Sequence, residues 1–136
     1  PQASIKFEGD TGPYVLYAYA RIASMLRKAE ENAMLPKTEA GIDWSLLADP
    51  AERALALRCS LYPESLQKAA RELDSSTLAS YLLDLAKDFS TFYRNCPVLA
   101  ASEPALREAR LALSARVREI LKDGLNALTI NTLESM

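Results

Sequence analysis

Histidine is absent from the 136 residues, and glycine and cysteine are scarce, with four and two residues. The missing histidine removes the side chain that most often acts as a general base, and also the commonest zinc ligand. Because a disulfide scaffold needs more than two cysteines, we interpret Cys59 and Cys96 as reduced thiols of a cytoplasmic protein. No apolar run approaches the roughly 20 residues of a membrane span and no signal peptide is visible, so we expect no membrane partner.

Positive charge is not in excess. Sixteen Lys and Arg residues against 18 Asp and Glu residues give a formal charge of −2. A protein that coats DNA is normally basic, so the sequence argues against DNA as a partner and limits any nucleic-acid site to a local patch. The length and the mixture of 49% hydrophobic with 25% charged residues are typical of one globular domain.

Motifs for catalysis or nucleotide binding are also missing. The sequence has neither a GxGxxG nor a GxxxxGK[ST] phosphate loop. Cys96 has no histidine in this chain to activate it as a nucleophile. The carboxylates lie scattered along expected helix faces, whereas catalytic pairs need burial to shift their pKa values. We therefore expect no catalytic residue, no cofactor and no metal site here.

The periodicity of apolar residues is helical almost throughout and predicts an all-α bundle of about five helices. The expected helices cover residues 11–32, 50–62, 63–73, 75–95 and 104–128, with a short tail after the last. Prolines stand at four of the starts, where a missing N–H group costs nothing, and Asp49 is the expected N-cap of the second helix. The loop 33–49 ends in "DWSLLADP", which is apolar enough to pack on the core.

Two of these helices carry clear buried stripes. In the fourth helix the stripe has spacings of 4, 3, 4 and 3, and consists of Leu78, Leu82, Leu85, Phe89 and Phe92. The stripe of the last helix runs from Leu106 to Leu128 and contains Gly124. A glycine inside a buried stripe indicates that a neighbouring helix comes close at that point.

The first helix carries three tyrosines in six residues, "YVLYAY". At about 100° per residue, Tyr19 falls at the margin of the apolar face and is expected in the core. Tyr14 and Tyr17 fall on the opposite, polar face together with Arg21 and Lys28. Exposed aromatic rings beside cations can stack on bases and meet phosphates. The alternative is that another segment, such as the C-terminal tail, covers these rings.

Two other groups are candidates for contacts. Tyr93 lies at the edge of the fourth helix stripe, and Asn95 closes that helix. On the last helix Arg118 and Lys122 share a face with Arg107, which could hold a phosphate backbone. A merely solvated basic face explains this pattern equally well.

The stretch "FEGDTGPYVLYAYARI" resembles the entry into the C-terminal domain of class I arginyl-tRNA synthetases, which typically read "GxTGPYxQYxHxR" there. The resemblance continues through "FYRNCPVL" to the terminal Met136 and covers nearly the whole chain. Three positions differ from the family pattern: Leu16 stands for a usual Gln, Tyr19 for a usual His, and "ESM" for "ERM".

The resemblance implies the all-α anticodon-binding fold of the class Ia synthetases, called the DALR domain, with arginine tRNA as its partner. It implies contacts to the anticodon loop from Tyr14, Tyr17, Arg21 and Met136, and further contacts from residues 93–98, of which Tyr93 and Asn95 are the candidates singled out. Backbone contacts from Lys28, Arg118 and Lys122 are further candidates. In such a ligase an upstream catalytic domain binds ATP and Mg²⁺ and charges the tRNA, whereas this part would be non-catalytic.

The expected domain organisation follows from the same resemblance. Residues 1–10 would link the domain to the upstream catalytic domain and pack poorly, and residues 11–136 would form the helical domain. A competing interpretation is a helical protein-interaction module that binds no RNA, with Tyr14 and Tyr17 docking a partner helix.

Overall fold

The chain folds into five α-helices in the computed structural model, which describes residues 12–134 and the side chains of residues 12–129. They are α2 (Gly12–Glu31), α3 (Pro50–Ser60), α4 (Tyr62–Glu72), α5 (Ser75–Asn95) and α6 (Pro104–Glu134), with the 3-10 helices η2 (Glu39–Gly41) and η3 (Trp44–Leu46) between α2 and α3. The described residues contain no strand. The predicted all-α class with about five helices is confirmed, and the expected start of α2 at residue 11 lies outside the described residues.

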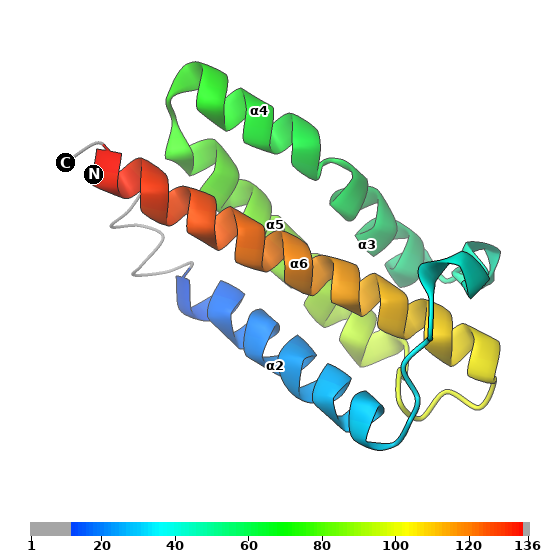
Figure 1. Cartoon of the computed structure of the whole chain (residues 1–136). Coiled ribbons are helices and arrows are strands. Elements are labelled where there is room, and N and C mark those ends of the chain that lie inside the picture. The colour runs from blue at the N-terminus through cyan, green and yellow to red at the C-terminus, as the bar shows by residue number, and fades with distance from the viewer. Residues whose placement is uncertain (1–11, 135–136) are drawn as a thin grey trace.

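Helix α5 is the centre of the bundle, because it packs against each of the other four α-helices. All five residues of its predicted stripe, from Leu78 to Phe92, are fully buried. Figure 1 shows α6 running along α5, with α2 on one side and the consecutive helices α3 and α4 on the other. The start of α2 and the last turns of α6 lie at the same end of the bundle (Figure 1).

The N-terminus of α3 is fixed as the sequence predicts. The Asp49 carboxylate accepts a hydrogen bond from the backbone N–H of Ala51, and the Glu52 carboxylate accepts one from the N–H of Asp49, at 2.9 Å each. This reciprocal capping box satisfies N–H groups that a helix start otherwise leaves without a partner.

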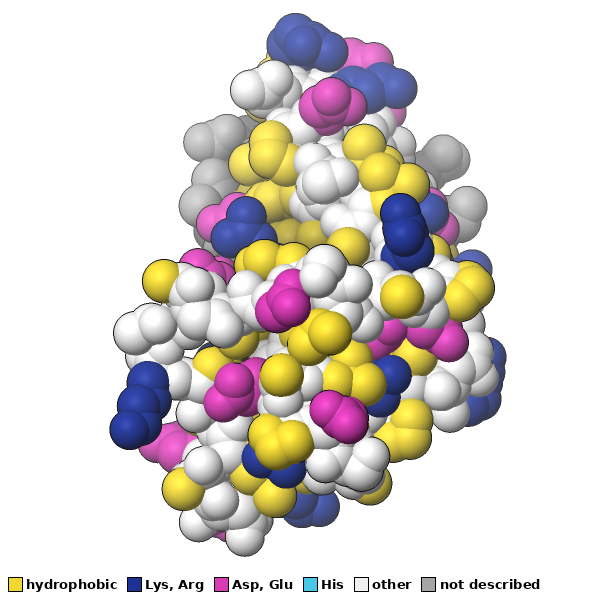
Figure 2. Space-filling view, turned by 90° about the vertical axis from the view of Figure 1, so that its right-hand side faces the viewer, with side chains coloured by type: hydrophobic (Ala, Val, Ile, Leu, Met, Phe, Trp, Pro, Cys, Tyr) yellow, Lys and Arg dark blue, Asp and Glu magenta, His cyan; other side chains and the backbone are white. Residues whose placement is uncertain are grey.

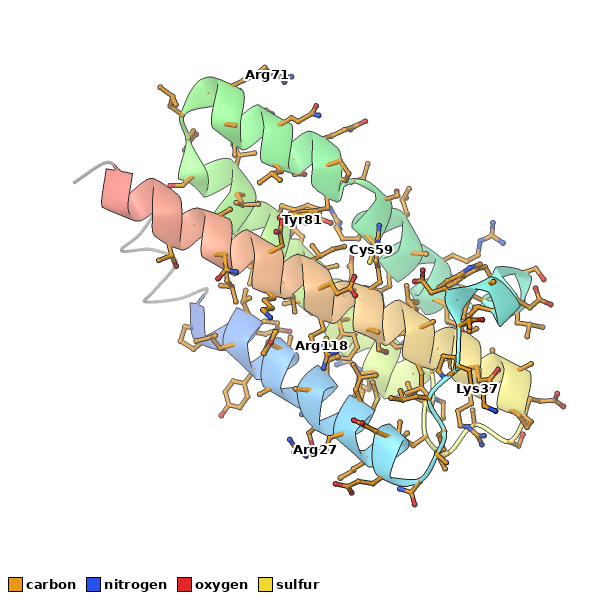
Figure 3. All side chains as sticks on the ribbon, viewed as in Figure 1. Arg27, Lys37, Cys59, Arg71, Tyr81 and Arg118 are labelled. Atoms are coloured by element: carbon orange, nitrogen blue, oxygen red, sulfur yellow. The ribbon has the colours of Figure 1, made fainter. Side chains whose placement is uncertain are left out.

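Helices α3 and α5 are also tied by polar contacts. The Tyr81 hydroxyl of α5 donates to the carbonyl of Arg58 in α3, close to the buried Cys59 (Figure 3). The Arg58 guanidinium in turn pairs with Asp88 at 2.8 Å. This hydrogen bond and this ion pair fix how α3 and α5 lie against each other.

The close helix approach predicted at Gly124 is present. A Cβ atom at this position would lie 2.6 Å from Cδ2 of Leu82, which is closer than real Cβ contacts come. The absence of a side chain therefore lets α6 lie directly on α5.

The predicted end of the last helix was wrong. We expected a tail after Leu128, but α6 continues to Glu134. The β-branched Thr129 weakens helix propensity, yet its hydroxyl donates to the carbonyl of Leu125 at 3.0 Å within the helix. No proline or glycine follows to stop the helix.

The loop between α2 and α3 docks as expected, but only through part of its apolar residues. Ile42 and Leu47 are buried, and η3 packs against α6. Trp44 and Leu46 remain exposed. Tyr19, expected in the core, is only partly buried, because it lies at the margin of the apolar face of α2.

Candidate nucleic-acid interface

The outer face of α2 carries two exposed aromatic rings. Tyr17 is 78% exposed and Tyr14 is 41% exposed, whereas Val15, Ala18 and Ile22 between and beyond them are buried. Because 3.6 residues make one helical turn, Tyr14, Tyr17 and Arg21 stand above one another on a single stripe. The division of the tyrosines into an outward pair and an inner one therefore holds, and no described segment covers the outward pair.

This stripe forms one wall of a cavity of about 630 Å³ between α2 and α5. The opposite wall comes from the end of α5, and the lining consists of Tyr14, Tyr17, Ala18, Arg21, Ser90, Tyr93 and Arg94. The volume lies in the range of small-ligand pockets and leaves room for a nucleobase.

Arg21 and Tyr93 join the two walls. The guanidinium carbon of Arg21 lies over the Tyr93 ring, 4.8 Å from its centroid, so the cation meets the negative face of the ring. The Tyr93 ring also packs on the buried Phe89, with centroids 5.9 Å apart. Tyr93 thus presents one anchored ring at the surface, where it is 40% exposed.

A second cavity of about 550 Å³ adjoins the first and shares Arg21 and Tyr93 with it. It extends along α2 to Lys28 and is bounded on the opposite side by residues 97–100, which follow α5. Lys28 thus lines the same cavity as Arg21 and Tyr93, from the polar face of α2 on which the sequence placed it.

The lining of both cavities has one sign of charge. Among its described residues Arg21, Lys28 and Arg94 are basic and none is acidic. Figure 2 views the bundle from the end that holds η3 and the start of α6, and there basic, acidic and hydrophobic side chains are interspersed. The positive lining therefore offers an anionic ligand a local site on a domain without net positive charge.

The remaining predicted residues lie elsewhere. Asn95 is the exposed last residue of α5 and lines neither cavity. Arg118 and the exposed Lys122 belong to α6, which contributes no lining residue to either cavity (Arg118 is labelled in Figure 3). Met136 and the expected linker 1–10 lie outside the described residues.

Ser90 and Arg94 also line the first cavity. Sequence reasoning missed Ser90, and it included Arg94 only within the region 93–98, without singling it out. A signal was available, because Arg94 follows Tyr93 directly and Ser90 lies one turn before it, on the flank of the buried α5 stripe. No group of three or more acidic or thiol side chains within the described residues is arranged to hold a metal ion. Within residues 12–134, no helix is long and apolar enough to cross a bilayer.

A known protein family matches most of this chain. Residues 15–136 match the family described as the DALR anticodon binding domain. The chain belongs to the DALR anticodon-binding domain family. The match starts at Val15, so it includes six of the seven residues that line the first cavity, all but Tyr14.

Relatives of this DALR domain are arginine–tRNA ligases. The ligase of Hahella chejuensis is 42% identical over 134 residues, and that of Proteus mirabilis is 39% identical over the same length. These matches cover 98% and 97% of this chain but only 22% of each ligase. The arginyl-tRNA synthetase structure of Thermus thermophilus superimposes with a TM-score of 0.75 at 43% identity, over 93% of this chain and 21% of the other. The chain thus spans about a fifth of the length of the relatives it matches.

Proposed function

We propose that this DALR domain binds the anticodon loop of an arginine tRNA through the cavity between α2 and α5. The observation that carries the proposal is the exposed pair Tyr14 and Tyr17 next to the stacked Arg21 and Tyr93. Loop bases that are not paired can stack on such rings, and each stacked base contributes roughly 1–3 kcal/mol. Membership of the DALR family favours this ligand over a partner helix.

The charge on two sides of the bundle supports the choice of this cavity. Two further cavities lie between α6 and the segment η2 to α4, and they share Cys59 and Arg116. Their described lining contains the carboxylates of Glu39, Glu119 and Asp123. A phosphate backbone is repelled by such a lining and attracted by Arg21 and Arg94 on the α2–α5 side.

In the proposed assignment Tyr14 and Tyr17 stack on the anticodon-loop bases, and Tyr93 with Arg21 holds a neighbouring base or phosphate. Asn95 and Met136 stay candidates for further loop contacts. Arg118 and Lys122 stay candidates for contacts to the tRNA backbone away from the cavity.

The proposed larger role is that of the anticodon-binding part of an arginine–tRNA ligase in the cytoplasm. ATP and Mg²⁺ would act in a catalytic domain elsewhere in that enzyme, and residues 1–10 would connect to it. Binding at the α2–α5 cavity would select the tRNA, and the chemistry of charging would take place at the far end of the same tRNA.

The test compares Tyr17→Ala with Leu16→Ala in the intact protein. Both side chains are exposed on α2, but only Tyr17 lines the cavity. Loss of one stacking partner should lower the affinity for an arginine tRNA transcript roughly ten-fold, and Tyr17→Phe should retain most of it. Leu16→Ala should bind as the unaltered protein does.

A second measurement uses transcripts with substituted anticodon bases. The unaltered protein should bind them more weakly than the arginine tRNA, and Tyr17→Ala should reduce this difference. Two results would contradict the assignment of the cavity. One is equal affinity of the unaltered protein for the arginine tRNA transcript and for the transcripts with substituted anticodon bases. The other is an affinity of Tyr17→Ala for the arginine tRNA transcript that equals that of the unaltered protein.

A further inference from the structure

A groove runs along α6 on the side that faces α3 and α4. It consists of two cavities of about 380 and 350 Å³, which lie between α6 and the segment from η2 to α4 and share Cys59 and Arg116. We call these two joined cavities the α6 groove. Cys59 lies between α3 and α6 (Figure 3), whereas α2 lies on the other side of α6 (Figure 1). The proposed RNA site therefore does not use this groove.

The floor of the α6 groove is apolar. Leu113 and Ile120 of α6 are buried, and so is Cys59 of α3. One face of α6 lines the groove at spacings of 3, 4 and 3, through Leu113, Arg116, Ile120 and Asp123. At about 1.5 Å per residue this face is roughly 15 Å long. The groove is thus long enough to contact about three turns of another helix.

An aromatic side chain stands at each end of the groove. Trp44 lines one end and is 45% exposed. Its backbone is held in η3, where the Asp43 carboxylate accepts a hydrogen bond from the N–H of Ser45 at 3.1 Å. At the other end the half-buried Tyr62 donates a hydrogen bond to Asp123. Tryptophan and tyrosine are enriched among the residues that dominate binding at protein interfaces.

The charges along the groove change sign twice. Glu39 and Arg116 line one cavity, and Arg116 lines the other with Glu119 and Asp123, so a basic group lies between acidic groups. Arg116 is exposed and forms no ion pair with another described residue. A complementary partner carries a basic residue toward each end and an acidic residue in the middle. RNA lacks this pattern, because its backbone is negative throughout.

A helical partner fits this groove better than an extended one. Most of its walls are α-helices, whose backbone N–H and C=O groups are paired within each helix. They offer no free edge to which an extended chain could hydrogen-bond, whereas a helix pairs its own backbone groups. Side chains at positions i and i+4 of a helix are neighbours on one face, so one can enter each of the two adjoining cavities.

We propose that the α6 groove docks an amphipathic helix of a protein partner. Two apolar side chains of that helix, one turn apart, enter the two cavities, and one of them packs on Trp44. An acidic side chain pairs with Arg116, and a basic side chain on each flank pairs with Glu39 and with Glu119. This inference goes beyond the proposed function, because it assigns a protein ligand to a surface away from the RNA site.

The probes are synthetic helical peptides of about 14 residues, or four turns. The matched peptide carries leucines at i and i+4, a central glutamate and a lysine toward each end. The reversed peptide has the sign of each charge exchanged. Fluorescence anisotropy of the labelled peptides with the intact protein should show the matched peptide binding roughly ten-fold more tightly, because like charges face each other in the reversed complex.

Charge exchange in the protein locates the binding site. Arg116→Glu should weaken the matched peptide roughly ten-fold and should strengthen a peptide whose central residue is lysine. The matched control is Arg71→Glu, at an exposed position of α4 that lines neither cavity of the groove (Arg71 is labelled in Figure 3). It should change neither affinity. Trp44→Ala should weaken the matched peptide about ten-fold, as the loss of an aromatic anchor does.

The arginine tRNA transcript separates this inference from the proposed function. A saturating amount of the matched peptide should leave the affinity for the transcript unchanged, and Tyr17→Ala should leave the affinity for the peptide unchanged. Equal binding of the matched and reversed peptides, unchanged binding of the matched peptide by Arg116→Glu, or competition between peptide and transcript would overturn the assignment of the groove. If the peptide results hold while Tyr17→Ala binds the transcript fully, the proposed function falls and the helix-docking groove stands.

Discussion

Arg110 and the buried Glu52 form a largely buried ion pair between residues 58 positions apart in the sequence. Nε of Arg110 lies 2.6 Å from Oε2 of Glu52, and the two side chains are only 13% and 1% exposed. Glu52 also caps α3 through the N–H of Asp49, and Arg110 also holds the carbonyl of Pro97. One pair thus joins the start of α3, the first turns of α6 and the wall of the second cavity.

We predict that Glu52→Ala lowers the free energy of unfolding by about 3–5 kcal/mol. The substitution leaves the largely buried Arg110 charge without its carboxylate partner, which is costly in a low-dielectric environment. Urea denaturation measures the change. Glu119→Ala, at an exposed position of α6, is the control and should stay within about 0.5 kcal/mol. A Glu52→Ala loss no larger than that of the control would contradict the role of the pair.

The combined variant Glu52→Leu with Arg110→Met separates stability from binding. Apolar side chains of similar volume often replace a buried ion pair without loss of stability, so most of the unfolding free energy should return. The carbonyl of Pro97 would lose its donor, however, and the affinity for the arginine tRNA transcript should stay below that of the unaltered protein.

Much of this fold was predictable because local rules determine it. Proline and N-cap positions set the helix starts, as at Asp49, and the spacing of apolar residues set the α5 stripe. The same angular arithmetic placed Tyr14 and Tyr17 outside and indicated the close approach at Gly124. These features depend on residues within a few turns of one another, so periodicity reports them directly.

Features that depend on distant partners were not predictable in this way. Nothing in the local pattern pairs Glu52 with Arg110, and nothing shows that residues 97–100 line one cavity together with Lys28. The stacking of Arg21 on Tyr93 required the packing of α2 on α5. Periodicity shows which side of a helix is polar, but not which other polar surface lies beside it.

The sequence placed the end of α4 within one residue, at residue 73 against the observed Glu72, but it did not indicate the geometry of that end, since no glycine marks it. Leu73 adopts the left-handed conformation with φ 52° and ψ 37°, and the N–H of Asp74 donates to the carbonyl of Ala69 at 3.1 Å. This is the geometry of a Schellman motif, in which glycine is usual because a Cβ atom is unfavourable there.

We therefore predict that Leu73→Gly stabilises the domain by roughly 1 kcal/mol. Leu73 is 93% exposed, so the substitution removes little packing. The matched control is Leu57→Gly, which places glycine in the right-handed interior of α3 at another exposed leucine. That change should destabilise by about 1 kcal/mol. Thermal unfolding of both variants should shift in opposite directions, and a loss of stability in Leu73→Gly would refute the strain at this position.

The buried thiols predict a pH dependence of stability. Burial raises the pKa of Cys59 from 9.0 to about 12, because the thiolate is poorly solvated there, although Arg116 lowers it and Asp88 raises it to a smaller extent. Burial likewise raises the pKa of Cys96 to about 11. Between pH 9 and the folded pKa the unfolded chain loses a thiol proton that the folded chain keeps, so stability falls as pH rises.

The expected result is a decline in unfolding free energy between pH 8 and pH 10 that is smaller in Cys59→Ala, by about 1 kcal/mol over this window. Tyr62 and Tyr81 also have raised pKa values, mainly because they are desolvated, but their contribution begins near pH 10. Urea titrations at pH 8, 9 and 10 therefore report chiefly on the cysteines. Equal pH slopes for Cys59→Ala and the unaltered chain would show that the thiol is not protected.

The last prediction concerns the chemistry of the Arg21 side chain. A lysine at this position keeps the charge but lacks the planar guanidinium that stacks on Tyr93. If the Arg21–Tyr93 pair forms a flat surface for bases, Arg21→Lys should weaken binding of the arginine tRNA transcript by roughly two- to five-fold, the equivalent of about 0.5–1 kcal/mol for an exposed cation–π contact.

The matched control is Arg27→Lys, at an exposed position of α2 that lines neither cavity (Arg27 is labelled in Figure 3). The loss should largely disappear in a Tyr93→Leu background, where there is no ring to stack on. An equal loss with and without Tyr93 would mean that Arg21 acts through its position alone and that the stacked pair has no part in holding the RNA.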